Sequence, residues 1–311
     1  MIIYVNKNYF ARGKTGKGKF AGRLVRAWRE MGIEVREDSK VKADIALHIG
    51  RMNYESWAKR HVLRAGPAII DTNRDWRKAN HMKAKSVKKA DAIVYQSKYS
   101  KKIYHKLVYK LDKPETIIFN GADLREFDVE PFDTRYEYNF LASTRLWLKQ
   151  KRLKQIIKAF EEVKIDNSCL IICGDVQGLE RKYKKLANVF FKGPADSVTL
   201  ARFYKTCDVA VHLTYVDACP NSVVEAQVAG LPVICTDQGG TKEVLRNGIV
   251  LKDFPFDYKP VNLKKPPIVK TDQIVKAINN VIKGNYQKKD VSDLYIQNIA
   301  KQYIDFFKGL L

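Results

Sequence analysis

The fold is decided between residues 208 and 245, where the chain reads DVAVHLTYVDACPNSVVEAQVAGLPVICTDQGGTKEVL. A short apolar run ends in a polar loop, the loop leads into a helix that begins near Ser222, and a Gly-Leu-Pro sequence stops that helix. The first N–H groups of a helix have no partner within it, so an anion can bind beside Pro220 and Asn221. The stretch therefore predicts a strand, a binding loop and a helix of a parallel α/β sheet.

Two carboxylates flank this predicted anion site. Glu225 lies about one turn into the helix, and Asp217 lies eight residues before it, on the loop that follows the strand. Acidic side chains beside an anion site do not favour the anion, but a carboxylate accepts hydrogen bonds from hydroxyl groups. The pattern therefore predicts a ligand that carries both phosphate and hydroxyl groups.

Short apolar runs alternate with helical patterns along the whole chain, which predicts a doubly wound α/β architecture in two halves. The segment 120–139 interrupts this alternation with glycine, proline and many charges, so we expect the interdomain linker there. Two helices are expected near 271–283 and 291–310. The other expected strands lie at 2–5, 44–49, 67–71, 91–95 and 116–119, and then at FLAST (140–144), CLIICG (169–174), VFFKG (189–193), VAVHL (209–213) and PVICT (232–236).

The composition bounds the class of protein. The chain has 311 residues and 45% hydrophobic content, enough for two domains of about 150 residues each. It lacks both a run of about 18 apolar residues and a leader-like apolar segment, so we expect neither a transmembrane helix nor a signal peptide. The five cysteines show no metal-ligand spacing and predict reduced thiols. A cytoplasmic, metal-free protein follows as the expectation.

The net charge of +23 favours acidic partners such as anionic lipid, nucleic acid or a phosphorylated substrate. The segment KYSKKIYHKLVYKL (98–111) predicts a basic amphipathic helix. Its apolar stripe has two interpretations: a core-facing side, or a surface that contacts an anionic membrane on its cytoplasmic face.

The stretch 208–245 resembles the retaining glycosyltransferases of the GT-B fold, in particular family 4. Their E-x7-E motif corresponds to Asp217-x7-Glu225, and EAQVAGLPVICTDQGG is similar to the family's following segment. The resemblance extends upstream to TRLWLKQKRLKQIIKAF (144–160), to LIICGD and NVFFKG, and to NGAD (120–123).

The resemblance implies two facing Rossmann-like domains. Residues 1–130 would form the N-terminal, acceptor-side domain, and residues 131–285 the nucleotide-sugar-binding domain. Residues 286–311 would form a C-terminal helix that packs back on the N-terminal domain. The implied reaction is the transfer of a sugar, of the hexosyltransferase type, from a nucleotide-diphosphate-sugar to an unidentified acceptor, for which the net charge favours an acidic molecule. It retains the anomeric configuration and requires no metal or other cofactor.

The resemblance also implies roles for individual residues. Arg145 and Lys151 would neutralise the departing diphosphate together with the helix N-terminus. Glu225 would accept hydrogen bonds from the donor ribose, and Asp217 would hold sugar hydroxyls. The remaining donor-binding residues would be Lys192 and Gly193 beside the base, and Pro220, Asn221 and Ser222 at the helix N-terminus.

A glycine-rich stretch, GKTGKGKF (13–20), follows the first apolar run. It fits part of a P-loop, but Phe20 stands where the metal-binding hydroxyl is required, which argues against triphosphate hydrolysis. The resemblance implies instead that Gly16 and Gly18 allow close approach to the donor phosphates, with Lys14, Lys17 or Lys19 adding positive charge.

Two departures from the family pattern leave other functions open. Asp217 is one methylene shorter than the usual glutamate, and Asn73 stands where a sugar-contacting histidine is common. The alternatives are a nucleotide-sugar epimerase, a GT-B relative that only binds its ligand, and a basic nucleic-acid-binding protein. No stacking motif or zinc module supports the last of these.

Overall fold

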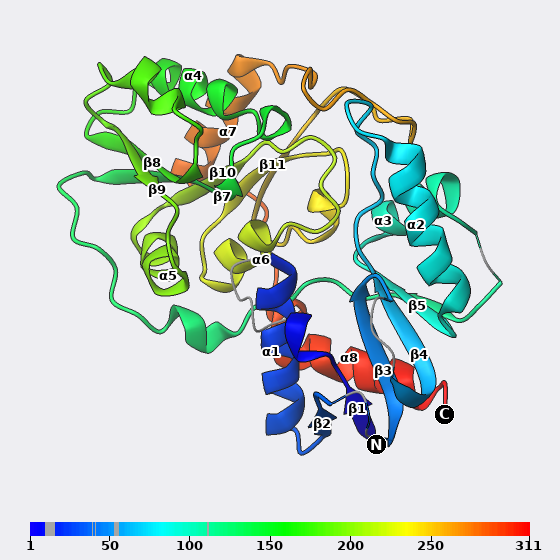
Figure 1. Ribbon diagram of the computed structural model, residues 1–311. Coiled ribbons are helices and arrows are strands. Elements are labelled where there is room, and N and C mark those ends of the chain that lie inside the picture. Colours follow the sequence, from blue (N-terminus) through cyan, green and yellow to red (C-terminus); the bar gives the residue numbers. More distant parts are fainter. Residues whose placement is uncertain (10–15, 39, 41, 53–55, 111) are drawn as a thin grey trace. The chain divides into compact units, whose positions relative to one another are not determined.

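Parallel strands form two separate sheets in the structure, a computed structural model that describes residues 1–9, 16–38, 40, 42–52, 56–110 and 112–311 (Figure 1). Each sheet belongs to its own unit, and each unit is assembled from separate stretches of chain. Unit 1 comprises residues 1–123, 257–261 and 292–311, and unit 2 comprises residues 124–256 and 262–291.

The described strands of unit 1 form a six-stranded, wholly parallel sheet in the order β2-β1-β3-β4-β5-β6. Their carboxyl ends therefore lie along one edge, the usual place for ligands in such sheets. The strands are β1 (Ile2–Tyr4), β2 (Glu34–Arg36), β3 (Lys42–Gly50), β4 (Trp57–Ala65), β5 (Ala92–Tyr95) and β6 (Glu115–Ile117).

Helix α8 (Ile296–Lys308) completes the core of unit 1 although it comes from the far end of the numbering. It packs beside α1 (Gly16–Glu30), where Trp28 is fully buried and donates from Nε1 to the carbonyl of Ala300 at 3.1 Å (Figure 1). The Trp28 ring lies 5.9 Å, between centroids, from each of the rings of Tyr303 and Phe307.

Helices α2 (Trp76–Lys89) and α3 (Lys98–Leu107) also belong to unit 1. In α3, Tyr99, Ile103 and Tyr104 are buried within the unit. The apolar stripe predicted for 98–111 thus contributes to the core, which favours the core interpretation over the membrane one. Position 111 itself lies outside the described residues.

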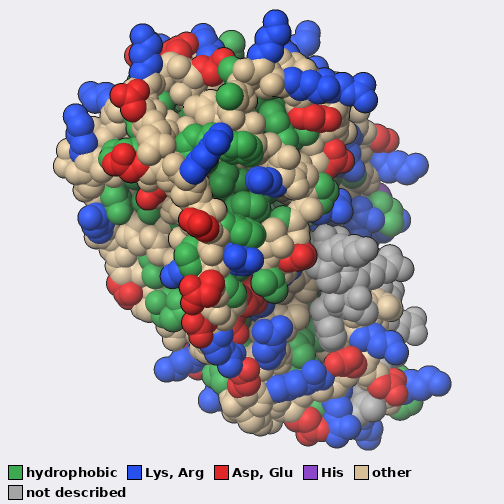
Figure 2. Space-filling model, turned by 90° about the vertical axis from the view of Figure 1, so that its left-hand side faces the viewer, with side chains coloured by type: hydrophobic (Ala, Val, Ile, Leu, Met, Phe, Trp, Pro, Cys, Tyr) green, Lys and Arg blue, Asp and Glu red, His purple; other side chains and the backbone are tan. Residues whose placement is uncertain are grey.

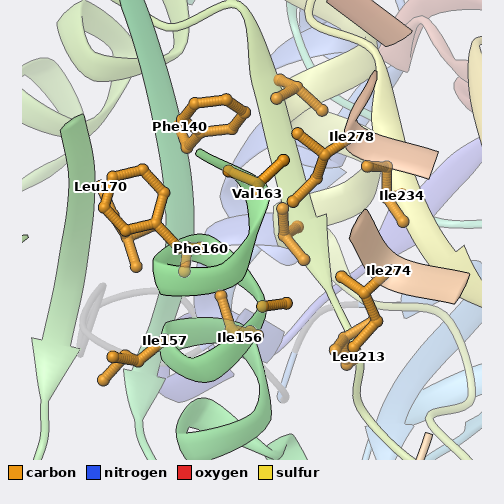
Figure 3. Close-up of a cluster of buried hydrophobic side chains, with 14 of the residues drawn as sticks. Phe140, Ile156, Ile157, Phe160, Val163, Leu170, Leu213, Ile234, Ile274 and Ile278 are labelled. Carbon is orange, nitrogen blue, oxygen red and sulfur yellow. The ribbon is translucent and has the colours of Figure 1, made fainter. Parts of the chain in front are cut away.

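The described strands of unit 2 form a second six-stranded parallel sheet, in the order β12-β11-β10-β7-β8-β9. Phe140 and Leu170 of the sheet meet Ile156 and Phe160 of α4 in its hydrophobic core, which Ile278 of α7 extends (Figure 3). The elements are β7 (Tyr138–Leu146), α4 (Leu153–Val163), β8 (Ser168–Asp175), β9 (Val189–Gly193), α5 (Ser197–Thr206), β10 (Val209–His212), α6 (Asn221–Val228), β11 (Val233–Thr236), β12 (Gly248–Leu251) and α7 (Thr271–Ile282).

The strands predicted for the second half are confirmed, although β12 was not predicted. In the first half β2 was not predicted either, and one expected strand needs correction. The expected strand at 67–71 is wrong, and the sheet instead contains β4 at 57–65, which carries Lys59, Arg60 and Arg64. The first half of β4 is mostly exposed and therefore tolerates long basic side chains, so the strand does not appear in the sequence as a continuous apolar run. Only Val62 to Ala65 are buried. Residues 70–72 pair instead with Val261, outside the sheet.

The basic residues are interspersed with acidic ones over the face shown in Figure 2, where blue and red side chains alternate. On that face the positive charge does not form one continuous stripe. Among the described helices, none is long and apolar enough to cross a membrane.

Candidate functional site

The predicted site residues of unit 2 lie at the carboxyl edge of its sheet. Because all its described strands are parallel, the ends of β7, β9 and β10 point to the same edge. Arg145 comes from the end of β7, Lys192 and Gly193 from the end of β9, and Asp217 from the loop that connects β10 to α6. The structure thus gathers residues that are far apart in the sequence.

Lys151 supplies a cation at this edge, and its contacts fix its position. It lies in the short 3-10 helix η3 (Lys149–Lys151), and its ammonium donates a hydrogen bond to the hydroxyl of Thr144 at the end of β7. Burial lowers the pKa of Lys151, nearby Arg145 lowers it further, and Asp217 opposes the shift. The three predicted groups therefore act on one another electrostatically, with exposed Arg145 on the solvent side.

The buried side chain of Arg152 holds this arrangement in place, a role that the sequence did not indicate. Its guanidinium forms two hydrogen bonds with the Asp253 carboxylate, at 2.6 and 2.9 Å, and both side chains are fully buried. It also donates to the Leu213 carbonyl at 3.1 Å and lies 5.0 Å from the centre of the Tyr215 ring. One side chain thus fixes the backbone next to Lys151 and the start of the loop that carries Asp217.

The loop itself is shaped by Gly239 and Gly240, the paired glycines of the quoted stretch. The Gly240 N–H donates to the Asp217 carbonyl at 2.7 Å. Gly239 has a φ of +84°, and a Cβ there would lie 2.6 Å from the same oxygen and 2.8 Å from Cα of Val216. Only glycine fits this approach, because other residues would clash with backbone atoms and adopt a strained φ.

Helix α6 begins at this loop as predicted. Pro220 precedes it and accepts hydrogen bonds from the N–H groups of Val223 and Val224, at 3.1 and 3.2 Å. Proline has no side-chain acceptor with which to cap the helix, so the side chain of Pro220 does not neutralise the positive end of the helix. Glu225 lies in the next turn, is only 3% exposed, and has the Tyr204 hydroxyl 3.5 Å from Oε2.

His212 is a further polar residue of the site, although scattered histidines of this chain gave no functional signal in the sequence. It ends β10, is 8% exposed, and its Nδ1 lies 3.5 Å from the Ser222 hydroxyl. Burial lowers the pKa of His212 to about 4, with Lys151 acting in the same direction and Asp217 against it. Within the described residues, its buried Nε2 has no hydrogen-bond partner.

The glycine-rich stretch belongs to the other unit. Gly16 and Gly18 lie in the first turn of α1, in unit 1. Gly13 and Lys14 lie outside the described residues, and Asn73, in unit 1, donates to the Asp71 carboxylate. Among the residues that the structure describes, no cluster of three or more His, Cys, Asp or Glu side chains is placed to hold a metal ion.

Comparison of sequences identifies a family and relatives that this chain resembles. The family model for glycosyl transferases group 1 matches residues 125–293. An uncharacterized glycosyltransferase (MJ1059) of Methanocaldococcus jannaschii is 26% identical over 266 residues, which cover 72% of this chain and 65% of that protein. The chain thus spans slightly less than two thirds of that relative. A second uncharacterized glycosyltransferase (MJ1607) of the same organism is 25% identical over 84% of this chain and 70% of its own length.

Solved structures share the fold. Sucrose-phosphate synthase from Thermosynechococcus elongatus superposes with a TM-score of 0.70 at 14% identity, covering 99% of this chain and 98% of that one. Anabaena Alr3699/HepE in complex with UDP and glucose superposes with a TM-score of 0.62 at 13% identity, covering 99% and 97%. The two parallel sheets correspond to the GT-B architecture of these proteins, and with the match over residues 125–293 the chain belongs to the glycosyl transferases of group 1.

Proposed function

We propose that this chain is a family 4, retaining glycosyltransferase that moves a sugar from a nucleotide-diphosphate-sugar to an acceptor without requiring a metal ion. The observation that carries the proposal is the joint placement of Lys151, Asp217 and the N-terminus of α6 at one edge of the unit 2 sheet. This edge supplies both cations for a diphosphate and carboxylates for hydroxyl groups.

The leaving diphosphate is stabilised by charge already in place. Arg145 and Lys151 provide two cations, and the N–H groups around Asn221 and Ser222 provide the positive end of a helix. Fixed charges of this kind stabilise charge that develops in the transition state without reorganising. Because His212 is held neutral by burial, the balance of positive charge rests on the other two side chains.

The carboxylates have separate tasks in this proposal. Buried Glu225 accepts hydrogen bonds from the donor ribose, and partly exposed Asp217 accepts them from the sugar. Lys192 and Gly193, at the end of the edge strand β9, lie where the base is held.

Uridine nucleotides are the first donors to test. Anabaena HepE is described with UDP and glucose, and pneumococcal GtfA with UDP and GlcNAc. Both proteins share only the fold with this chain, since their identity to it is 13%. These two proteins support the choice of uridine nucleotides as the first probes, and the experiment identifies the base that this chain binds.

The test is a thermal-shift panel of UDP, GDP and ADP with their sugar conjugates, with and without EDTA. A ligand at about 100 times its Kd stabilises the fold by about 2.7 kcal/mol. We expect one nucleotide to give an EDTA-insensitive shift that is lost in Glu225→Ala and Lys151→Met. Lys149→Met is the matched control, because Lys149 belongs to the same short helix and is exposed.

The stereochemistry and the reaction class are tested on the same protein. With the identified donor, the anomeric configuration of the product, measured by NMR, should equal that of the donor. Inverted product would contradict the retaining mechanism. Isomerised donor in the absence of any acceptor would establish an epimerase instead, and binding without turnover of any acceptor would establish a binding-only relative.

A further inference from the structure

Unit 1 contains a cluster of basic side chains, of which only Lys17 was a candidate for the donor site. The cluster gathers at the carboxyl ends of β3 and β4, from the start of α1, from the two strands and their exits, and from α2. Its members are Lys17, Arg51, Arg64, Arg74 and Lys83. We call it the unit 1 cation cluster.

Two glycines bring its ammonium groups together. A Cβ on Gly66, just after β4, would lie 3.6 Å from Nζ of Lys83 and 3.8 Å from Nζ of Lys17. A Cβ on Gly50, the last residue of β3, would lie 2.8 Å from the same Lys17 nitrogen. Both ammonium groups therefore lie against bare backbone at the strand ends, close enough for one small anion to reach both.

Among the described residues, the inner members of the cluster are buried without a counterion. Lys83 is 6% exposed and Arg64 is 3% exposed. In the part of the chain that the structure describes, the Lys83 ammonium forms neither a hydrogen bond nor an ion pair, and the Arg64 Nε has no partner. Arg64 is held in place by Asn120, which accepts from Nη2, and by the Phe20 ring at 4.1 Å.

The charges of the cluster repel one another. Burial lowers the pKa of Lys83 to about 8, and Lys17, Arg51 and Arg74 lower it further. The pKa of Lys17 is lowered by partial desolvation and by Arg51 and Arg64. Buried like charges without a counterion destabilise a fold, since each loses hydration and gains only repulsion. An anion of high charge density would reverse this cost.

We propose that the unit 1 cation cluster binds the phosphate group of a phosphate monoester. Such a group carries nearly two negative charges at neutral pH and three acceptor oxygens, which suits several cations around one point. Arginine offers it paired donors, and lysine offers a compact charge. That this monoester is the sugar acceptor rests on the proposed transferase function, whereas binding itself does not.

The first experiment is a thermal-shift titration with glycerol 3-phosphate, against glycerol and against sodium chloride at equal ionic strength. Loss of one charged hydrogen-bond donor should weaken binding by about tenfold or more. We expect this in Lys83→Met, whereas Lys85→Met should bind as the wild type does, because Lys85 is exposed on the opposite side of the same helix. Arg74→Met, at an exposed position of the cluster, is the second test should Lys83→Met fail to fold.

A nucleotide arm separates this site from the donor site. Lys83→Met should keep the stabilisation by the donor nucleotide, and Lys151→Met should lose it while keeping that by glycerol 3-phosphate. If Lys83→Met loses both, the cluster serves the donor and the proposal is wrong. It is equally wrong if sodium chloride stabilises the wild type as much as the ester does, or if Lys83→Met and Lys85→Met respond alike. If glycerol 3-phosphate stabilises the wild type but no nucleotide does, the transferase proposal is wrong and the phosphate-site proposal is unaffected.

The source of the ester is decided by co-sedimentation with phosphatidylcholine vesicles, with and without phosphatidic acid. Binding that requires phosphatidic acid and is lost in Lys83→Met identifies a lipid phosphate. Absence of co-sedimentation, beside stabilisation by glycerol 3-phosphate, identifies a soluble phosphate ester.

Discussion

Lys151 illustrates how a single side chain in the candidate site is tuned by its surroundings. Its hydrogen bond to Thr144 fixes the position of the ammonium, and its burial makes the charge easier to lose than that of an exposed lysine. The motif in the sequence predicted the residue. The direction of its pKa shift required the contacts with Asp217 and Arg145, which only the fold brings close.

This shift predicts how nucleotide binding depends on pH. The charged lysine binds the diphosphate, so affinity should decline as pH rises through the lowered pKa of Lys151, below the 10.5 of an ordinary lysine. Lys151→Arg keeps its charge and should lack this decline. Isothermal titration with the identified nucleotide at a series of pH values checks it, and identical profiles for the two proteins would contradict it.

Gly239 gives a second prediction for a single residue. In Gly239→Ala the new methyl would meet the backbone of Asp217 and Val216, so we expect a lower Tm and weaker nucleotide binding. Gly178→Ala is the matched control, since it has nearly the same φ, +82°, with no atom within 4 Å of the new Cβ. Left-handed strain alone costs about 1 kcal/mol. Equal losses in both variants would show that the contact with the loop is unimportant.

Whole elements were predictable where the chain is buried on both sides. The strands of unit 2 read as continuous apolar runs because helices cover a parallel sheet. Strand β4 was not predicted because Lys59 and Arg60, in its exposed half, interrupt the apolar pattern. The apolar segment 67–71, which was predicted as a strand, lies outside the sheet. The Arg152–Asp253 pair could not be predicted for another reason: the partners are 101 residues apart, and only Arg152 lies in a stretch that carries the family resemblance.

That ion pair predicts how firmly η3 and the Asp217 loop are joined. Asp253→Asn leaves a buried guanidinium without its counter-charge, so the free energy of unfolding should fall by about 3–5 kcal/mol. Glu162→Gln is the control, because it breaks only the exposed pair with Lys158 and should change stability by less than about 1 kcal/mol. Urea denaturation measures both, and comparable effects would refute the anchoring role of Arg152.

At the scale of the whole molecule, the chain passes between its units more than once. Unit 1 is built from residues near both ends of the numbering, and helix α8 supplies part of its core. The family resemblance implied two domains and a C-terminal helix that packs back on the first, but the sequence did not show which residues that helix contacts. The hydrogen bond from Trp28 to Ala300 spans 272 positions, and Ala122 exchanges backbone hydrogen bonds with Leu294 and Ile296.

Removal of α8 should therefore unfold unit 1. Each buried Phe, Tyr or Ile contributes about 1.5–3 kcal/mol, so losing several exceeds the margin by which domains are stable. Deletion of residues 292–311 should red-shift the tryptophan fluorescence and increase dye binding to apolar surface. Deletion of residues 309–311 should change neither. Native-like fluorescence in the longer deletion would mean that α1 and its sheet are stable without α8.

The same interleaving sets an order of events during protein synthesis. A ribosome releases the first 123 residues long before it makes α8, so Trp28 and its apolar neighbours emerge without the partner that will cover them. All segments of unit 2 emerge before α8 does. Every segment of unit 2 is thus made before unit 1 is complete, and the apolar side of α1 stays uncovered until α8 emerges.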